Sequence, residues 1–249
     1  RVDVTIPASW PLTHQRLSAY EKCPRQFLYT HVLGLGGGGN TTAFLQTHRC
    51  LIALLKWLGT ARLSGSPSIG EAEAEFERIW ESRGPTDHAF AKDYRALAST
   101  LIAAVVRFGA GRRFRPAEAI ALDLASGQVL VEPDELAELP DGTVVLRRVR
   151  TGKRREEEYD QLDYTLYQLA GRAKYGESTR VEAIHLTDGV LEDVSVSTKK
   201  LSNRRDKARA MLESIRLGEF PAKVNSITCP RCPHFFTCDA VAKGSLALS

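Results

Sequence analysis

Apolar residues recur every three or four positions through the first 110 residues, the spacing of one buried helix face. A first helix, capped by Thr13, is predicted to continue through Leu28 and to end at the glycine run 34–39. Three further amphipathic helices are predicted at 41–59, 70–83 and 88–109. The chain is therefore expected to open with an N-terminal helical subdomain.

From residue 119 the period of the apolar pattern changes to two, which is typical of strands. Strands are predicted at 119–124, 128–131 and 143–149, with the turn Pro140-Asp141-Gly142 before the third. This part is expected to form a β-meander. A helix at 159–175, strands at 181–186 and 191–196, and a helix at 201–217 are predicted to follow. The order indicates an α/β fold whose core sheet is flanked by helices.

Three consecutive regions are predicted within one structural unit. They are a helical region (1–115), an α/β core (116–220) and a C-terminal cysteine segment (221–249). Because no stretch approaches the roughly 18 apolar residues of a membrane-spanning helix, we expect no membrane partner and a cytoplasmic location. The first residue is Arg1 and not methionine, so we expect a domain from a longer polypeptide.

Composition excludes several protein classes but identifies none. With 249 residues, of which 43% are hydrophobic and 26% charged, a disordered or fibrous chain is excluded. A net charge of +4 is too small to identify a nucleic-acid-binding protein. Five cysteines are too few for a disulfide-stapled secreted domain. Three of them, however, fall within ten residues near the C-terminus, and this placement is informative.

The three clustered cysteines form the pattern Cys229-x2-Cys232-x5-Cys238. A disulfide would leave one of these thiols unpaired. Soft thiolate ligands select zinc or an iron–sulfur centre, and either centre needs a fourth ligand. Two candidates are open: His234 would complete a zinc site, and the distant Cys23 would complete an all-cysteine site.

Two segments carry a family resemblance. Residues 17–27 (LSAYEKCPRQF) resemble the opening motif of the RecB-like branch of the PD-(D/E)xK nuclease superfamily, and residues 229–238 (CPRCPHFFTC) resemble the closing motif of its iron–sulfur members. That branch includes the AddB C-terminal nuclease domain and the CRISPR-adaptation nucleases. The resemblance implies a restriction-endonuclease-like core and a stabilising [4Fe–4S] cluster. The ligands that it implies are Cys23, Cys229, Cys232 and Cys238.

The resemblance also implies a metal-dependent catalytic site, from which this chain departs. His48 matches the family's helical histidine, Asp134 matches its first aspartate, and Gln161 matches its helix motif. The catalytic strand, however, has Arg148 in place of the metal-binding acid and Arg150 in place of the lysine. At an effective dielectric near 20, a unit charge about 4 Å from a divalent ion contributes roughly 8 kcal/mol, here as repulsion.

We therefore expect a domain that has lost metal-dependent cleavage and needs no catalytic Mg²⁺. One alternative is an active exonuclease in which a nearby acid has replaced the missing one. The candidates for such a migrated acid are Glu132, Glu156, Glu157 and Glu158. Another alternative is a structural module that binds a protein partner and does not contact DNA.

Much of the positive charge lies in two segments. The first contains the candidate DNA-binding residues Arg147, Arg148, Arg150, Lys153, Arg154 and Arg155, and the second is 199–209. Since arginine binds phosphate bidentately, the first segment is expected to hold DNA, either single-stranded or at a duplex junction. The resemblance further implies a helicase motor in the same chain or complex, acting in recombination, repair or defence.

Overall fold

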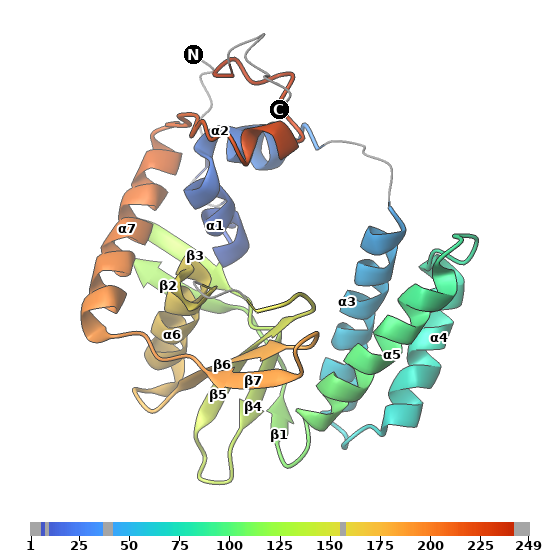
Figure 1. Cartoon of the computed structure of the whole chain (residues 1–249). Helices are drawn as coiled ribbons and strands as arrows, with labels where there is room; N and C mark the ends of the chain where they lie inside the picture. The colour runs from blue at the N-terminus through green and yellow to red at the C-terminus, as the bar shows by residue number, and fades with distance from the viewer. Residues whose placement is uncertain (1–5, 8–9, 37–41, 155–157, 242–249) are drawn as a thin grey trace. The chain divides into compact units, whose positions relative to one another are not determined.

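The computed structural model describes residues 6–7, 10–36, 42–154 and 158–241 (Figure 1). The chain divides into two compact units, each described here by itself. The first comprises residues 1–39, 123–130 and 202–249, and the second comprises residues 40–122 and 131–201. This division is by contact, whereas the three predicted regions follow the order of the chain, and those regions stay a prediction.

A mixed five-stranded sheet forms the core of the second unit, in the order β1-β4-β5-β6-β7 (Figure 1). Its strands are β1 (Arg113–Arg115), β4 (Glu135–Glu138), β5 (Val144–Arg150), β6 (Arg180–His185) and β7 (Val190–Asp193). Only β5 and β6 pair in parallel, and α6 (Leu162–Tyr175) connects them. The predicted α/β class, a core sheet with flanking helices, is confirmed.

Three helices of the second unit pack against the sheet. They are α3 (Ala43–Ala61), α4 (Ile69–Arg83) and α5 (Ala91–Arg107), close to the three predicted ranges. Their apolar faces, including the fully buried Cys50, share one core cluster with Val149 of β5 and Ile184 of β6. Cys50 is thus a core residue of α3.

The predicted β-meander is wrong. β2 (Ile120–Leu124) and β3 (Gly127–Val131) form a separate two-stranded sheet, and Leu130 of β3 makes in addition an isolated parallel bridge to Thr13. β5 instead pairs with β4 and β6. The apolar pattern did not reveal β4 because Glu135 and Glu138 stand at its two ends, and Glu135 is buried in ion pairs.

In the first unit, the predicted helix through Leu28 is broken at Cys23. Thr13 caps α1 (His14–Lys22) as expected, its hydroxyl accepting from the Arg16 amide at 3.4 Å. Cys23 is extended (φ −157°), because the following Pro24 disfavours helical backbone at the preceding residue. α2 (Pro24–Phe27) and a π-helical turn (Leu28–Val32) follow. The break places Cys23 between two helices.

The first unit also holds most of the last helix, α7 (Thr198–Arg216), and a 3₁₀ turn at Cys229–Arg231. Its core joins Phe27, Tyr20 and Phe220, whose rings pack with centroids 5.5 to 6.2 Å apart. The predicted glycine run begins at Gly34, in left-handed conformation (φ +64°), and from residue 37 it lies outside the described residues. Within those residues, no helix is both long and apolar enough to cross a membrane.

Candidate functional site

The strand expected to carry the substituted catalytic positions is β5, in the middle of the five-stranded sheet. Arg148 is 9% exposed, and its Nη2 lies 2.6 Å from Oδ2 of Asp163 in the first turn of α6. Its guanidinium also lies 5.0 Å from the centroid of the Tyr164 ring. The arginine that occupies the acid position is therefore held and neutralised by the neighbouring helix.

Arg150, two residues further along β5, is paired in the same way. Its Nε lies 3.2 Å from Oε1 of Glu158, which is buried in the 3₁₀ turn before α6. The Tyr164 hydroxyl donates to the same carboxylate oxygen at 3.2 Å, and His185 lies 3.8 Å from the other oxygen. Glu158 is thus occupied as the partner of Arg150.

Asp134 directly precedes β4 and is tied to β5 by its backbone and its side chain. Its amide donates to the Arg147 carbonyl at 3.1 Å, and its carboxylate accepts from the Val149 amide at 2.8 Å. The side chain reaches solvent but is densely surrounded by protein, and this desolvation raises the pKa of Asp134 to about 6. The Val149 hydrogen bond and the Arg148 charge oppose that rise.

The remaining positions of the expected catalytic site do not form a metal centre with Asp134. His48 lies half-buried on α3, and Gln161 is the N-cap residue of α6. Among the described residues, no group of three or more His, Cys, Asp or Glu side chains is arranged to hold a metal ion. Of the candidate migrated acids, Glu132 is exposed, Glu158 is paired with Arg150, and Glu156 and Glu157 lie outside the described residues.

One residue of the predicted DNA-binding segment cannot have that role. Arg147 is fully buried, its Nη1 lies 2.7 Å from Glu135, and its Nε lies 3.2 Å from Glu182. Its Nη2 donates to the Phe108 carbonyl at 2.7 Å. With no exposed surface, this guanidinium cannot bind a DNA phosphate. The prediction failed because Arg147 faces the opposite side of β5 from Arg148 and Arg150.

The end of the segment reaches the surface. Arg154 lies 2.9 Å from Glu192, and its amide donates to Asp188 at 2.6 Å. Lys153 is exposed and makes no ion pair within the described residues, and Arg155 lies outside them. Most of the described basic side chains in this segment are therefore compensated by nearby acids. In the second basic segment, Lys207 on α7 pairs with Glu21 of α1 at 2.7 Å.

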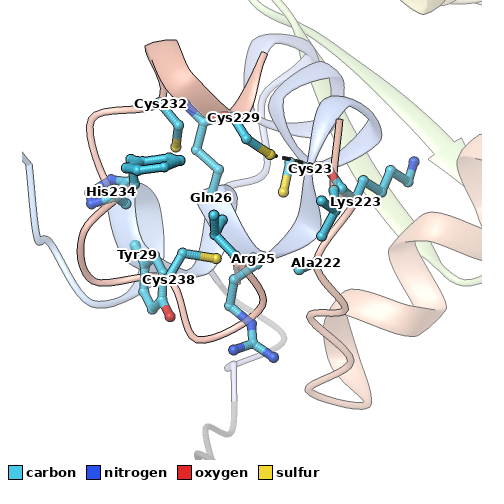
Figure 2. A pocket seen from close by; sticks show the side chains of 13 residues that line it. Cys23, Arg25, Gln26, Tyr29, Ala222, Lys223, Cys229, Cys232, His234 and Cys238 are labelled. Carbon is cyan, nitrogen blue, oxygen red and sulfur yellow. Dashed lines mark hydrogen bonds between the residues drawn. The ribbon is translucent and has the colours of Figure 1, made fainter. Parts of the chain in front are cut away.

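A pocket in the first unit brings the four candidate cysteine ligands together (Figure 2). Cys23, Cys229, Cys232 and Cys238 line it, and its empty volume is about 340 Å³. The helix break presents Cys23. Local turns present the others: the Cys232 amide donates to the Cys229 carbonyl at 3.0 Å, and the Cys238 amide donates to the His234 carbonyl at 2.9 Å.

The donor set of the pocket suits a soft metal centre. Burial, followed by the three neighbouring cysteines, raises the pKa of Cys232, since thiolates crowded together repel one another. A bound cation would reverse that repulsion. His234 is buried, and its Nε2 lies 2.8 Å from the Thr30 hydroxyl. The four thiols line this pocket, but within the described residues they are not arranged as a group that could hold a metal ion.

Comparison with known families gives a match. A family model of the PD-(D/E)XK nuclease superfamily matches residues 11–239, a range that includes β5 and all four pocket cysteines. The chain belongs to the PD-(D/E)XK nuclease superfamily. No curated protein matches the chain. Nuclease superfamily membership connects the chain with nucleic acids.

Within this PD-(D/E)XK domain, sequence reasoning missed the acids that compensate the arginines. Asp163 and Glu158 were not expected to pair with Arg148 and Arg150, and neither was Glu135 with Arg147. The sequence contained a partial signal for Asp163. It lies two residues after the N-cap residue Gln161, in the first turn of α6, where a carboxylate is common. The pairing itself depends on how α6 packs over β5.

Proposed function

We propose that this chain is a nuclease-like, DNA-binding domain of the RecB-like branch that does not cleave DNA and is stabilised by a [4Fe–4S] cluster. The observation that carries the loss of cleavage is the ion pair of Arg148 with Asp163 at 2.6 Å. The pair fixes a positive charge at the position expected to hold a metal-binding acid. Asp134 alone then offers a divalent ion too few ligands.

The neighbouring pair supports the same conclusion. Arg150 stands where the catalytic lysine is expected, and it neutralises Glu158, one of the acids that we considered as a substitute for the missing one. The two arginines therefore leave no acid at these two positions and also occupy the acids that could attract a metal ion. If the metal-binding acid had simply been replaced by a neutral residue, Asp163 and Glu158 would lack these arginine partners.

A cleavage assay tests the loss of activity. The purified chain is incubated with single-stranded and duplex DNA in Mg²⁺ or Mn²⁺, beside an Asp134→Ala variant prepared identically. We expect the two preparations to leave the DNA equally intact. Cleavage by the wild type that Asp134→Ala abolishes would refute the proposal and favour the active exonuclease.

The cluster proposal rests on the convergence of four cysteines from distant parts of the chain on one pocket. Four thiolates are the ligand set of a [4Fe–4S] cluster, which supplies cross-linking here and no step of a reaction. Zinc is the alternative, because the four cysteines, or three of them with His234, which also lines the pocket, are zinc ligand sets too. Anaerobic purification should give iron and sulfide in equal amounts, and Cys232→Ser should lose both. Zinc without sulfide would contradict the cluster.

DNA and a helicase motor in the same chain or complex are the partners we propose. Superfamily membership and the exposed Lys153 and Arg154 support DNA binding. One observation favours a second candidate, a protein-interaction module: Arg148, Arg150 and Arg154 all have acidic partners. Charge reversal at Lys153 and Arg154 tests both. Lower DNA affinity supports the first function. Absence of DNA binding by the wild type, together with motor binding that the variant loses, supports the second.

A further inference from the structure

An open groove lies between the α3–α4 loop and the edge strand β1 of the second unit. Its empty volume is about 1040 Å³. The described residues that line it include four arginines and two serines but no acid; those six are Arg62, Arg112, Arg113, Arg115, Ser64 and Ser66. A surface that combines guanidinium and hydroxyl donors without a carboxylate suits an anion.

In the lining of the groove and behind it, the positive and negative charges do not balance. Arg62 and Arg147 both pair with Glu135, while Arg147 and Arg112 both pair with Glu182. Three arginines thus share two glutamates. Nη1 of Arg112 is buried and has no hydrogen-bond partner among the described residues. A surplus buried charge is unfavourable unless another group compensates it.

The rim of the groove adds to this surplus. Arg115 pairs with Glu138 at 2.6 Å, but the exposed Arg113 has no acidic partner within the described residues. Arg113 and Arg115 are two residues apart on β1, so their side chains leave the same face about 7 Å apart. Spaced cations along an open groove match a row of phosphates better than they match a single small anion.

We propose that this groove binds the phosphate backbone of a nucleic-acid strand. The proposal rests on the DNA binding proposed above and adds a contact surface made by β1 and the α3–α4 loop. The guanidiniums of Arg113 and Arg115 bind successive phosphates, and the hydroxyls of Ser64 and Ser66 donate to phosphate oxygens. The surplus charge of the buried arginines strengthens the attraction from below.

Two variants change the charge of the groove without disturbing the buried network. Arg113→Glu reverses the unpaired charge. Gly65→Glu introduces an acid at a position where an added Cβ meets nothing within 4 Å. Gly65→Lys is the matched control of opposite sign. Arg83→Glu makes the same charge change at the far end of α4, about 20 Å along the helix from the loop.

The readout is the affinity of the full chain for a labelled single-stranded oligonucleotide and for its duplex, measured by fluorescence anisotropy in EDTA at several salt concentrations. We expect Arg113→Glu and Gly65→Glu each to weaken binding about three- to tenfold at low salt and to flatten the salt slope by about one. Arg83→Glu should bind as the wild type does, and Gly65→Lys at least as tightly.

The groove proposal would be overturned if both acidic variants bound the oligonucleotide with wild-type affinity. It would also be overturned if the groove bound inorganic phosphate but no oligonucleotide. A Lys153→Glu variant separates this failure from that of the proposed function. If only Lys153→Glu loses binding, the groove is wrong and DNA binding by the domain stands. If the wild type binds no oligonucleotide, both are wrong. Because EDTA removes divalent metal, an active nuclease would leave the binding result interpretable.

Discussion

At the residue scale, the decisive feature is that each arginine on β5 is matched by an acid from another element. The Arg148 and Asp163 side chains are only 10% and 7% exposed, so their charges interact with little solvent screening. Desolvation offsets much of the attraction in such a pair, and its net contribution to stability is small. Removal of one partner, by contrast, leaves an uncompensated buried charge.

Asp163→Asn is therefore expected to lower the free energy of unfolding by about 3 kcal/mol, the cost of leaving Arg148 buried and unpaired. Adding Arg148→Met should recover most of this loss. The exposed pair of Arg180 and Asp193 gives the control, since Asp193→Asn should cost less than about 1 kcal/mol. Urea unfolding of the variants measures all three. Equal costs for Asp163→Asn and Asp193→Asn would show that the Arg148 pair is not a buried one.

Asp134 makes stability depend on pH in an unusual direction. Because its pKa is raised to about 6, the folded state favours the protonated acid, and this stabilisation is lost as pH rises through about 6. Asp134→Asn should therefore stabilise the chain at pH 7 to 8, by no more than about 1 kcal/mol because the side chain reaches solvent. The gain should vanish near pH 4. Urea unfolding as a function of pH measures it, and a gain that grows toward low pH would contradict the raised pKa.

At the element scale, the sequence predicts the helices well and the sheet only in part. The ranges for α3, α4 and α7 lie within a few residues of the structure because each has a long apolar stripe. β1 and β4 are three and four residues long and rich in charge, so neither has an alternation long enough to predict a strand. Their existence depends on pairing with distant strands, which local pattern does not encode.

The candidate sites, like the fold, were predictable from the sequence only in part. The cysteine spacing and the Cys-Pro step are local, and the four cysteines that they indicated do line one pocket. Whether Arg147 is buried depends on which face of β5 is covered by helices. Which acids pair with Arg148 and Arg150 depends on the packing of α6. The arginines at the expected catalytic positions were visible in the sequence, whereas the acids that pair with them required the fold.

The contact of α6 with the sheet gives a test at this scale. A Cβ added at Gly171 would lie 2.7 Å from Thr179 Cγ2 and 3.1 Å from Leu146 Cδ1. Gly171→Ala should therefore destabilise the chain by about 1 to 3 kcal/mol through overpacking, despite the better helix propensity of alanine. Gly59→Ala on α3, where nothing lies within 4 Å, should stabilise it by about 0.5 to 1 kcal/mol. Thermal unfolding of both variants checks the opposite signs, and a stabilising Gly171→Ala would show that α6 does not approach β5 and β6 so closely.

At the scale of the whole molecule, the two units are expected to respond differently to loss of the proposed cluster. All four pocket cysteines belong to the first unit, while the buried charge network and the five-stranded sheet belong to the second. A cross-link from Cys23 to the C-terminal cysteines closes a loop of roughly 200 residues, worth about 5 kcal/mol by analogy with a disulfide. The cross-link also opposes local opening of the segments that it joins, and these belong to the first unit.

Removal of the proposed cluster by an iron chelator under reducing conditions should therefore weaken the first unit selectively. Hydrogen exchange measured by mass spectrometry is expected to rise by at least tenfold in α1, in most of α7 and in the turn at Cys229–Arg231, because their packing loses the cross-link. Peptides from β5 and β6 should keep their protection, since their core of Val149, Ile184 and the helices α3 to α5 contains no cluster ligand. Cys232→Ser should reproduce the effect and Cys50→Ala should not raise exchange in α1. Uniform loss of protection in both units would mean that the cluster stabilises the chain as one cooperative whole, and no change in either unit would mean that the cysteines do not hold a stabilising centre.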